Sequence, residues 1–168
     1  MKKRSEDLIR VVILGGGPAG VACALTLDRL ASELGRSVEC TIVEGKQFSG
    51  ERHYNPCVGV LSPILAELLE EELGVPFPSH LSRTKITGYV LHTPGETIEL
   101  SDDIPSVALR RVHFDAYMAE AAKKRGTNWI QARAVDLEFH ESYVIVYTEN
   151  EPVSYTHLTL PTNRVACR

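Results

Sequence analysis

The chain of 168 residues predicts an α/β fold built on a parallel sheet. An apolar, β-branched run over 8–14 is typical of a buried parallel strand. A turn with spaced glycines over 15–20 follows, and a helical pattern over 21–34 then ends at a glycine. A second apolar strand over 38–43 comes next. This order of strand, glycine turn, helix and strand carries the prediction.

The turn has glycine at 15, 17 and 20, which is the spacing G-x-G-x-x-G. Gly15 permits a tight turn, Gly17 leaves the backbone open to a diphosphate, and Gly20 lets the helix lie close to the strand. Exposed N–H groups and the helix dipole attract a diphosphate at this point. In its strand–turn–helix context the motif predicts a dinucleotide-binding corner of the Rossmann type. The alternative is an ordinary glycine turn in another α/β domain.

The second strand ends at Glu44, 24 residues beyond the last glycine of the motif, close to the expected distance of about 20. A carboxylate at this place can accept hydrogen bonds from both hydroxyls of an adenosine ribose, and it would repel a 2′-phosphate. Glu44 therefore predicts ribose binding and argues against NADP in this slot. The alternative is an ordinary, solvated strand end.

The apolar start of the chain could also be a membrane anchor or a secretory leader, but its details argue against both. The uncharged run over 11–27 is shorter than a spanning helix and contains four glycines and a proline. Glu6 and Asp7 interrupt the positive segment that a leader needs. We therefore expect no leader and no membrane span.

The composition is that of an ordinary globular protein, with 43% hydrophobic residues, 24% charged residues and a net charge of −4. It provides no basic footprint for nucleic acid. The four cysteines form no C-x-x-C pair and the histidines show no metal-ligand spacing, so we expect no metal site. Cys23 and Cys40 fall on apolar faces, as buried thiols do, which favours a reducing, cytoplasmic location.

The middle of the chain changes character. After a long polar loop over 45–63, we expect a helix over 64–73. Alternating residues over 84–109, with a turn at 93–96, predict a β-hairpin that interrupts the strand–helix rhythm and starts a second, inserted sheet. The further expected elements are a short strand, a helix over 112–125, a strand over 128–132, and a hairpin formed by 135–140 and 143–147.

The last residues, 153–168, read VSYTHLTLPTNRVACR. Ten of them, Val153 to Thr162, match the in-frame translation of the transposon-end adapter used in sequencing libraries. We therefore expect 1–152 to be the native part of the domain. Residues 153–168 are expected to be adapter and index sequence, which says nothing about the native fold. The alternative is a genuine edge strand.

Four short motifs together resemble a known family. They are GGGPAG at 15–20, Glu44, Asn-Pro-Cys-Val-Gly at 55–59, and Arg111-x-x-Phe114-Asp115. Over 9–147 the chain resembles FAD-dependent oxidoreductases of the para-hydroxybenzoate hydroxylase fold, and most of all their geranylgeranyl reductase branch. The cysteine loop points to that branch, although Val58 stands where the branch often has a second glycine.

The resemblance implies a set of cofactor contacts. The residues that would bind FAD are Gly15, Gly17, Pro18, Ala19 and Gly20 at the diphosphate, Glu44 and Lys46 at the adenosine ribose, Ala134 and Val135 at the adenine through backbone groups, and Arg111 at the flavin end. Cys57 would lie close to the isoalloxazine, where it could donate a proton or guide substrate. His53 and Tyr54 are further candidates for the same pocket. The alternatives are a surface ion pair for Arg111, an exchange of roles with Arg110, and a small buried loop residue in the case of Cys57.

The implied function is that of an FAD-dependent oxidoreductase in which reduced flavin gives a hydride to an unsaturated small molecule of isoprenoid type, with NAD(P)H as a transient electron donor. The alternatives are a flavin-dependent monooxygenase of the same fold and a truncated, non-catalytic nucleotide-binding fragment. Family members have a later Gly-Asp motif at the ribityl chain and further strands of the substrate sheet, and neither occurs before Pro152. The resemblance thus implies a truncated FAD-binding domain with the start of a substrate-side sheet. A prenyl-lipid substrate would allow loose membrane association.

Overall fold

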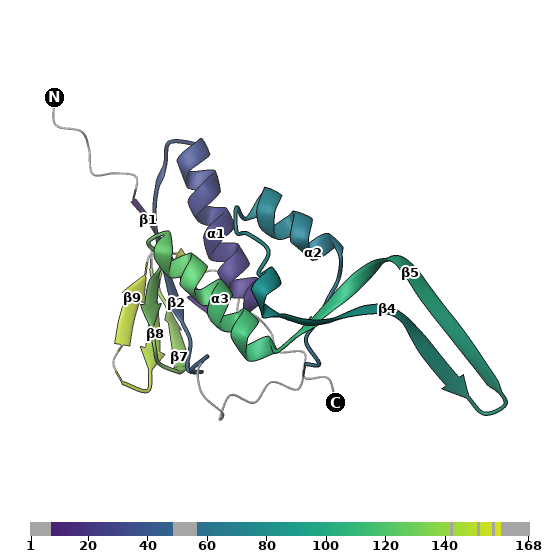
Figure 1. The fold of residues 1–168 in the computed structure, drawn as a ribbon. Helices are drawn as coiled ribbons and strands as arrows, with labels where there is room; N and C mark the ends of the chain where they lie inside the picture. The colour runs from purple at the N-terminus through teal and green to yellow at the C-terminus, as the bar shows by residue number, and fades with distance from the viewer. Residues whose placement is uncertain (1–7, 49–56, 142, 151, 156, 159–168) are drawn as a thin grey trace. The chain divides into compact units, whose positions relative to one another are not determined.

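A computed structural model describes residues 8–48, 57–141, 143–150, 152–155 and 157–158. The chain divides into two compact units, each with sheets of its own. The first unit consists of Met1–His53 with Met118–Arg168, and the second of Tyr54–Tyr117. Figure 1 labels most of the helices and strands of both units.

A four-stranded parallel sheet forms the centre of the first unit. Its strands lie in the order β10 (His157–Leu158), β1 (Leu8–Leu14), β2 (Ser37–Val43) and β6 (Asn128–Ile130). The register of β1 on β2 runs from Leu8 opposite Ser37 to Leu14 opposite Val43, so the carboxyl ends of these two strands lie side by side. The helix α1 (Pro18–Glu33) joins them. The parallel-sheet α/β fold expected from the sequence is confirmed.

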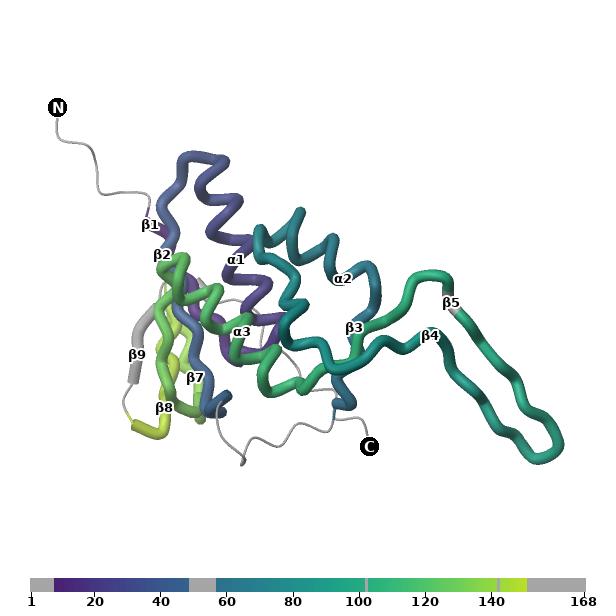
Figure 2. Tube along the Cα trace, in the orientation of Figure 1, coloured from purple at the N-terminus to yellow at the C-terminus, as the bar shows by residue number. Residues whose placement is uncertain are grey.

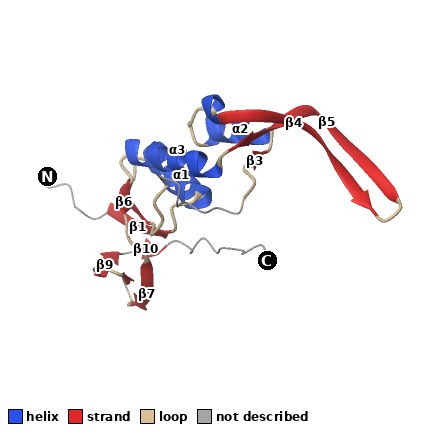
Figure 3. Cartoon of the chain, turned by 60° about the horizontal axis from the view of Figure 1, so that its bottom comes forward, coloured by secondary structure: helices blue, strands red, loops and turns tan. Residues whose placement is uncertain are grey.

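The parallel sheet is covered on both faces. Side chains alternate along β1, and Ile13 faces α1, where its Cγ2 lies 3.3 Å from the position that a Cβ would take on Gly20. On the opposite face Val12 and Val43 form a buried cluster with Val146, which belongs to a second sheet of the same unit. Helix, parallel sheet and second sheet thus form three layers (Figure 3).

The third layer is an antiparallel sheet of β7 (Ala134–Phe139), β8 (Val144–Thr148) and β9 (Pro152–Tyr155), in that order. The expected hairpin is present as β7 and β8, with each strand shifted by one residue from its expected bounds. Residues of the adapter-like tail take part in β9 and β10. The origin of this tail is a question of gene sequence, so the expectation for 153–168 stays a prediction.

The ends of the helices follow glycines and a proline. α1 begins at Pro18, with Gly17 as its N-cap, rather than at the expected residue 21, because proline fits the first helical turn. It ends before Gly35, whose φ of 61° is the left-handed backbone that many helix ends adopt. The helix α3 (Arg111–Lys124) is likewise followed by a glycine of positive φ, Gly126.

The second unit contains a three-stranded antiparallel sheet in the order β3 (Val60–Leu61), β5 (Glu96–Leu109) and β4 (Ser82–Thr93). β4 and β5 form the expected inserted hairpin, and Gly95 with φ 105° completes its two-residue turn. Figure 2 shows the hairpin as two long adjoining segments. The short strand that the sequence predicts separately after the hairpin is the end of β5, because β5 stays paired with β4 as far as Leu109.

Three short helical segments complete the second unit. They are α2 (Ile64–Glu67), the π-helical η1 (Leu68–Glu72) and the 3₁₀-helical η2 (Ser79–Leu81). The helix expected over 64–73 is therefore one helical stretch whose second half widens, so that Leu73 N donates to Leu68 O at 3.3 Å. Leu69 is buried, while Glu67, Glu70, Glu71 and Glu72 are exposed.

Candidate functional site

The first candidate site is the corner between β1 and α1. Gly15 has φ 103°, a backbone conformation that residues with side chains rarely adopt. Its N–H donates to Val43 O at the end of β2 (2.9 Å), which ties the turn to the neighbouring strand. Gly17 is the N-cap in extended backbone, and Val21 N donates to Gly17 O (3.0 Å) in the first helical hydrogen bond.

Close contacts within the chain explain two further glycines of this corner. A Cβ on Gly20 would lie 2.0 Å from Gly15 O, which is closer than a side chain can approach a backbone atom. A Cβ on Gly16 would lie 2.3 Å from Cη2 of Trp129. At Gly17, by contrast, no atom of the described residues other than its chain neighbours lies within 4 Å of the Cβ position. The corner is thus tightly packed at two glycines and open at the third.

The first turn of α1 presents backbone donors at this open position. The N–H groups of Ala19 and Gly20 have no acceptor within the helix, and Pro18 has no N–H. The whole of α1 is described, and its N-cap has no side-chain hydrogen bond and its first turn no acidic residue. The positive end of the helix dipole adds to the same site. The corner can therefore hold an anion such as a diphosphate.

The Glu44 carboxylate lies against the glycine turn. Its Oε2 accepts a hydrogen bond from Gly16 N (2.8 Å), and its Oε1 accepts one from Lys46 N (2.7 Å). An ionised carboxylate has about four lone-pair positions, so each oxygen can accept from a further donor. Two hydroxyls on adjacent carbons of a ribose match this capacity. Ribose binding by Glu44 stays a prediction, and the side chain points to the corner where that role needs it.

Two residues at the end of β6 support this corner, and no motif marks either of them. The chain's single tryptophan, Trp129, packs on Gly16. The Phe48 ring lies edge-on to the Trp129 ring, with 6.1 Å between the centroids. Lys123 Nζ lies 5.1 Å from the centroid of the Trp129 ring. Gln131 Nε2 donates to Glu44 O (2.8 Å) and to Lys46 O (3.0 Å). The only signal available in the sequence is a large aromatic residue shortly after a helix-ending glycine.

The other predicted residues of the first unit lie on the loop after β2 and on β7. Lys46 takes part through its backbone, whose N–H donates to Glu44 and whose carbonyl accepts from a glutamine. Arg133 lies against Gly45, since a Cβ on that glycine would be 3.2 Å from Arg133 Cβ. This contact brings the chain just before β7 to the loop after β2. Val135 lies in β7 with 60% of its surface exposed, and its contact with adenine stays a prediction.

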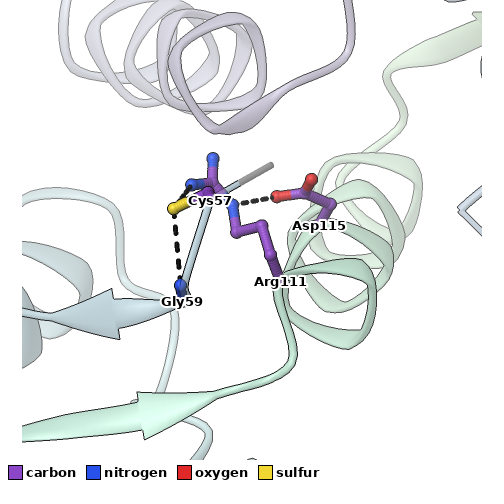
Figure 4. A network of polar contacts seen from close by, with 4 residues as sticks. All are labelled: Cys57, Gly59, Arg111 and Asp115. Carbon is purple, nitrogen blue, oxygen red and sulfur yellow. Dashed lines mark hydrogen bonds and ion pairs between the residues drawn. The ribbon is translucent and has the colours of Figure 1, made fainter. Parts of the chain in front are cut away.

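The second candidate site is a polar cluster in the second unit, shown in Figure 4. Arg111, the first residue of α3, donates from Nε to Asp115 Oδ1 (2.6 Å) and from Nη1 to Cys57 Sγ (3.5 Å). The Cys57 sulfur also accepts from Gly59 N (3.5 Å). The structure thereby brings together the Cys57 and Arg111 motifs, although these two residues are 54 positions apart in the sequence.

Charge in this cluster is concentrated on a buried ion pair. Asp115 is 3% exposed, and its carboxylate pairs with the guanidinium one helical turn earlier. Burial lowers the pKa of Arg111, but the hydrogen bond and charge of Asp115, together with those of Cys57, raise it above its ordinary value. Arg111 therefore stays charged. The ion pair of Arg111 is formed with a buried acid and not with a surface acid, and its contact with the cofactor stays a prediction. Arg110 is exposed.

Gly59 has a local reason in this cluster. Its φ is 76°, and a Cβ would lie 2.0 Å from Leu109 O, while Leu109 N donates to Gly59 O (2.9 Å). This glycine thus lets the cysteine loop meet the end of β5. Val58 is 85% exposed, and Cys57 is exposed as well, which differs from the alternative of a small buried loop residue.

Two residues that the sequence suggested for the flavin pocket cannot be assigned to either site. His53 and Tyr54 lie outside the described residues, as do the first two residues of the Asn-Pro-Cys motif. His113 is exposed. Among the described residues no group of three or more His, Cys, Asp and Glu could hold a metal ion. No helix in the described part of the chain is long and apolar enough to cross a membrane.

The cysteines of the first unit lie outside this chemistry. Cys40 is 8% exposed in β2, and burial, followed by the charges of Cys23 and Asp28, raises its pKa to about 12. Burial also raises the pKa of Cys23. Both thiols therefore stay protonated at neutral pH, as structural residues do.

Two curated proteins are relatives of this chain in sequence. A probable electron transfer flavoprotein-quinone oxidoreductase of Escherichia coli (strain K12) is 29% identical over 141 residues, which cover 82% of this chain and 31% of that protein. The chloroplastic geranylgeranyl diphosphate reductase of Arabidopsis thaliana is 28% identical over 158 residues, or 88% of this chain and 30% of that protein. The chain thus spans about a third of the length of these relatives. No family model matches it.

Solved structures share its fold. The halogenase PltM, in complex with phloroglucinol and FAD, superposes with a TM-score of 0.66 at 18% identity, over 89% of this chain and 33% of that one. A geranylgeranyl bacteriochlorophyll reductase-like protein from Thermoplasma acidophilum gives 0.63 at 20% identity, over 88% and 37%. The resemblance predicted from the motifs is therefore confirmed: in sequence and in fold this chain is similar to one part of FAD-dependent oxidoreductases that include geranylgeranyl reductases.

Proposed function

We propose that this chain is the cofactor-binding part of an FAD-dependent oxidoreductase. The residues assigned to FAD are Gly15, Gly17, Pro18, Ala19 and Gly20 at the diphosphate, Glu44 and Lys46 at the adenosine ribose, and Val135 at the adenine. One observation carries the proposal. The space at Gly17 is open beside the uncapped start of α1, and the Glu44 carboxylate is held 2.8 Å from Gly16 N at the same corner.

The residues present fit the ADP half of FAD. Ala19 and Gly20 would donate backbone N–H groups to the diphosphate, because neither N–H has an acceptor within the helix. A side chain at Gly17 would fill the space that the phosphate oxygens need. Glu44 would accept from the two ribose hydroxyls and, by charge repulsion, exclude a 2′-phosphate.

For the flavin end we assign Arg111, with Cys57 beside the isoalloxazine. The charge of Arg111 is maintained by buried Asp115, and a guanidinium can donate to several oxygen acceptors at once. The Cys57 thiol can hold or release a proton. The hydrogen bond of 3.5 Å between Arg111 Nη1 and Cys57 Sγ supports the assignment, since it joins two motifs that the family resemblance gives to one site.

We further propose that the whole protein reduces an unsaturated small molecule of isoprenoid type. Bound FAD supplies the hydride chemistry, and NAD(P)H is the proposed electron donor. Support comes from the cysteine loop and from the relative that is a geranylgeranyl diphosphate reductase. Anaerobic reduction of a prenyl double bond by the whole enzyme is the expected result. Oxygen uptake driven by an aromatic compound would favour the monooxygenase alternative instead.

Nucleotide titration of the purified chain tests the cofactor assignment. We expect ADP to bind in isothermal calorimetry, and we expect FAD to be held in a yellow complex whose fluorescence changes on addition of ADP. A nucleotide with a 2′-phosphate is expected to bind about tenfold or more weakly than ADP, because one charged hydrogen bond is replaced by repulsion. A chain that binds neither FAD nor ADP would overturn the proposal. A chain that binds ADP but holds no FAD would leave the alternative of a truncated, non-catalytic nucleotide-binding fragment.

A further inference from the structure

A glutamine that no motif marks holds the loop from which Glu44 projects. Gln131 follows directly after β6, and its Nε2 donates both to Glu44 O (2.8 Å) and to Lys46 O (3.0 Å). A primary amide has two N–H hydrogens, so one nitrogen can serve two carbonyls. The side chain therefore closes the loop over 44–46 against the end of the neighbouring strand.

The same loop carries the carboxylate of the corner. Lys46 N donates to Glu44 Oε1 (2.7 Å), and Gly16 N donates to Glu44 Oε2 (2.8 Å). The backbone of Glu44 is tied to β6 as well, because its N–H donates to Ile130 O (3.0 Å). Both the main chain and the side chain of Glu44 are thus fixed by hydrogen bonds, and Gln131 donates one to the main chain of Glu44 and one to that of Lys46.

We propose that Gln131 is a positioning residue for ribose recognition, acting through Glu44. The inference rests on the proposed function, because it concerns how the same corner selects its nucleotide. Gln131 sets the turn that directs Lys46 N at Oε1, and this contact holds the carboxylate in one orientation. A carboxylate held in one orientation binds two adjacent hydroxyls better than one that rotates, since no rotamer freedom is lost on binding.

The chemistry of the amide is essential to this role. In Gln131→Glu the side chain keeps its length, but a carboxylate oxygen replaces the donor and meets two carbonyl oxygens. In Gln131→Ala the clamp is removed with no charge added. Gln131 is exposed, so neither change leaves a cavity in the core. A loss of ribose selectivity in both variants is therefore expected without unfolding of the domain.

The test compares ADP with 2′-deoxy-ADP by isothermal calorimetry on the full chain. The wild type is expected to favour ADP by about tenfold, the contribution of one hydrogen bond to a charged group. In Gln131→Ala and Gln131→Glu this ratio is expected to fall to about twofold, while 2′-deoxy-ADP binds within about threefold of its wild-type affinity. A merely structural role would weaken both nucleotides equally and leave the ratio unchanged.

Gln47→Ala is the matched control. Gln47 lies on the same loop, is exposed, and makes no side-chain hydrogen bond to the described residues, so its variant is expected to keep the wild-type ratio. A ratio that survives in both Gln131 variants would overturn the positioning role and leave the proposed function intact. A wild type that binds neither nucleotide would overturn the proposed function, and a wild type that binds both equally would overturn ribose recognition by Glu44. Each result is thus assigned to one of the three statements.

Discussion

Replacing Gly17 by aspartate separates binding from folding, because the two should change in opposite directions. Gly17 has φ −69° and ψ 176°, a backbone that any residue adopts, and its Cβ position is open in the described chain. Aspartate is among the best N-cap residues, and its carboxylate would accept from the unsatisfied N–H groups of the first helical turn. The same carboxylate would occupy the place assigned to the diphosphate.

The expected stability change is small and favourable. An aspartate in place of an N-cap glycine adds a few tenths of a kcal/mol from capping. Its charge at the positive end of the helix dipole adds about 0.3–1 kcal/mol. The Tm should therefore rise by about 1–4 °C, at about 2–4 °C for each kcal/mol in a domain of this size. No packing term opposes this gain, since apart from its chain neighbours no atom of the described residues lies within 4 Å of the new Cβ.

The expected binding change is large and unfavourable. Losing one hydrogen bond to a charged phosphate costs about 1.5–3 kcal/mol. Two like charges about 4 Å apart near a protein surface add a repulsion of several kcal/mol. ADP should therefore bind at least about 100-fold more weakly to Gly17→Asp than to the wild type. Gly17→Asn is the matched control, because it caps the helix equally well without the charge and should lose less affinity.

Differential scanning fluorimetry and calorimetric titration with ADP, on the same preparations, measure both quantities. Gly20→Ala is the opposite case: its Cβ would lie 2.0 Å from Gly15 O, so it should lower the Tm whether or not a ligand is present. The reasoning is refuted if Gly17→Asp raises the Tm and binds ADP as tightly as the wild type. The diphosphate would then have to bind somewhere other than at this corner.

Three further predictions concern other parts of the chain. Asp115→Ala leaves the half-buried Arg111 guanidinium without its 2.6 Å partner, so the free energy of unfolding in urea should fall by about 1–3 kcal/mol, and Asp115→Asn should restore part of it. Desolvation first, and then neighbouring charges, raise the pKa of Cys40 to about 12, above the value of about 8.5 in an unfolded chain. Because the folded-state pKa is the higher one, this contribution to stability is complete below about pH 8.5 and is lost as the pH rises toward 12. Urea midpoints measured between pH 8 and pH 10 should therefore decline less in Cys40→Val than in the wild type. We also propose that 153–168 are adapter-derived, so sequencing the source locus should give a different reading from residue 153 on; the same codons in the genome would contradict this.

Elements with a local cause could be predicted from the sequence. The bounds of β1 match the apolar run over 8–14, because a buried parallel strand needs β-branched residues along its whole length. Gly35 ends α1 because only a residue without a side chain readily takes its φ of 61°. Glu44 could also be anticipated, since the residue that follows a strand lies next to the turn of its parallel neighbour. Local chemistry determines each of these.

Contacts between distant residues could not be predicted in this way. Gln131 donates to the carbonyl of a residue 87 positions earlier, and no pattern in either segment specifies that pairing. Arg111 and Cys57 are 54 positions apart, and only the family resemblance assigned them to one site. Trp129 reads as an ordinary core aromatic, although its ring is the reason that residue 16 must be a glycine. Tertiary packing determines these contacts, and the hydrophobic periodicity of each segment does not specify which distant residues will meet.

The glycines of the corner give an argument by elimination for a ligand. Gly15 is required by its φ of 103°, Gly16 by the ring of Trp129, and Gly20 by the carbonyl of Gly15. No such contact or backbone conformation within the described chain requires Gly17. A serine or aspartate there would fit the backbone, fill open space and cap α1 better than glycine does. The chain forgoes that stability at the one position where a side chain would cover the helix's unsatisfied N–H groups. A glycine that packing within the described residues does not require therefore supports the proposed diphosphate site, because two adjacent phosphates suit those N–H groups.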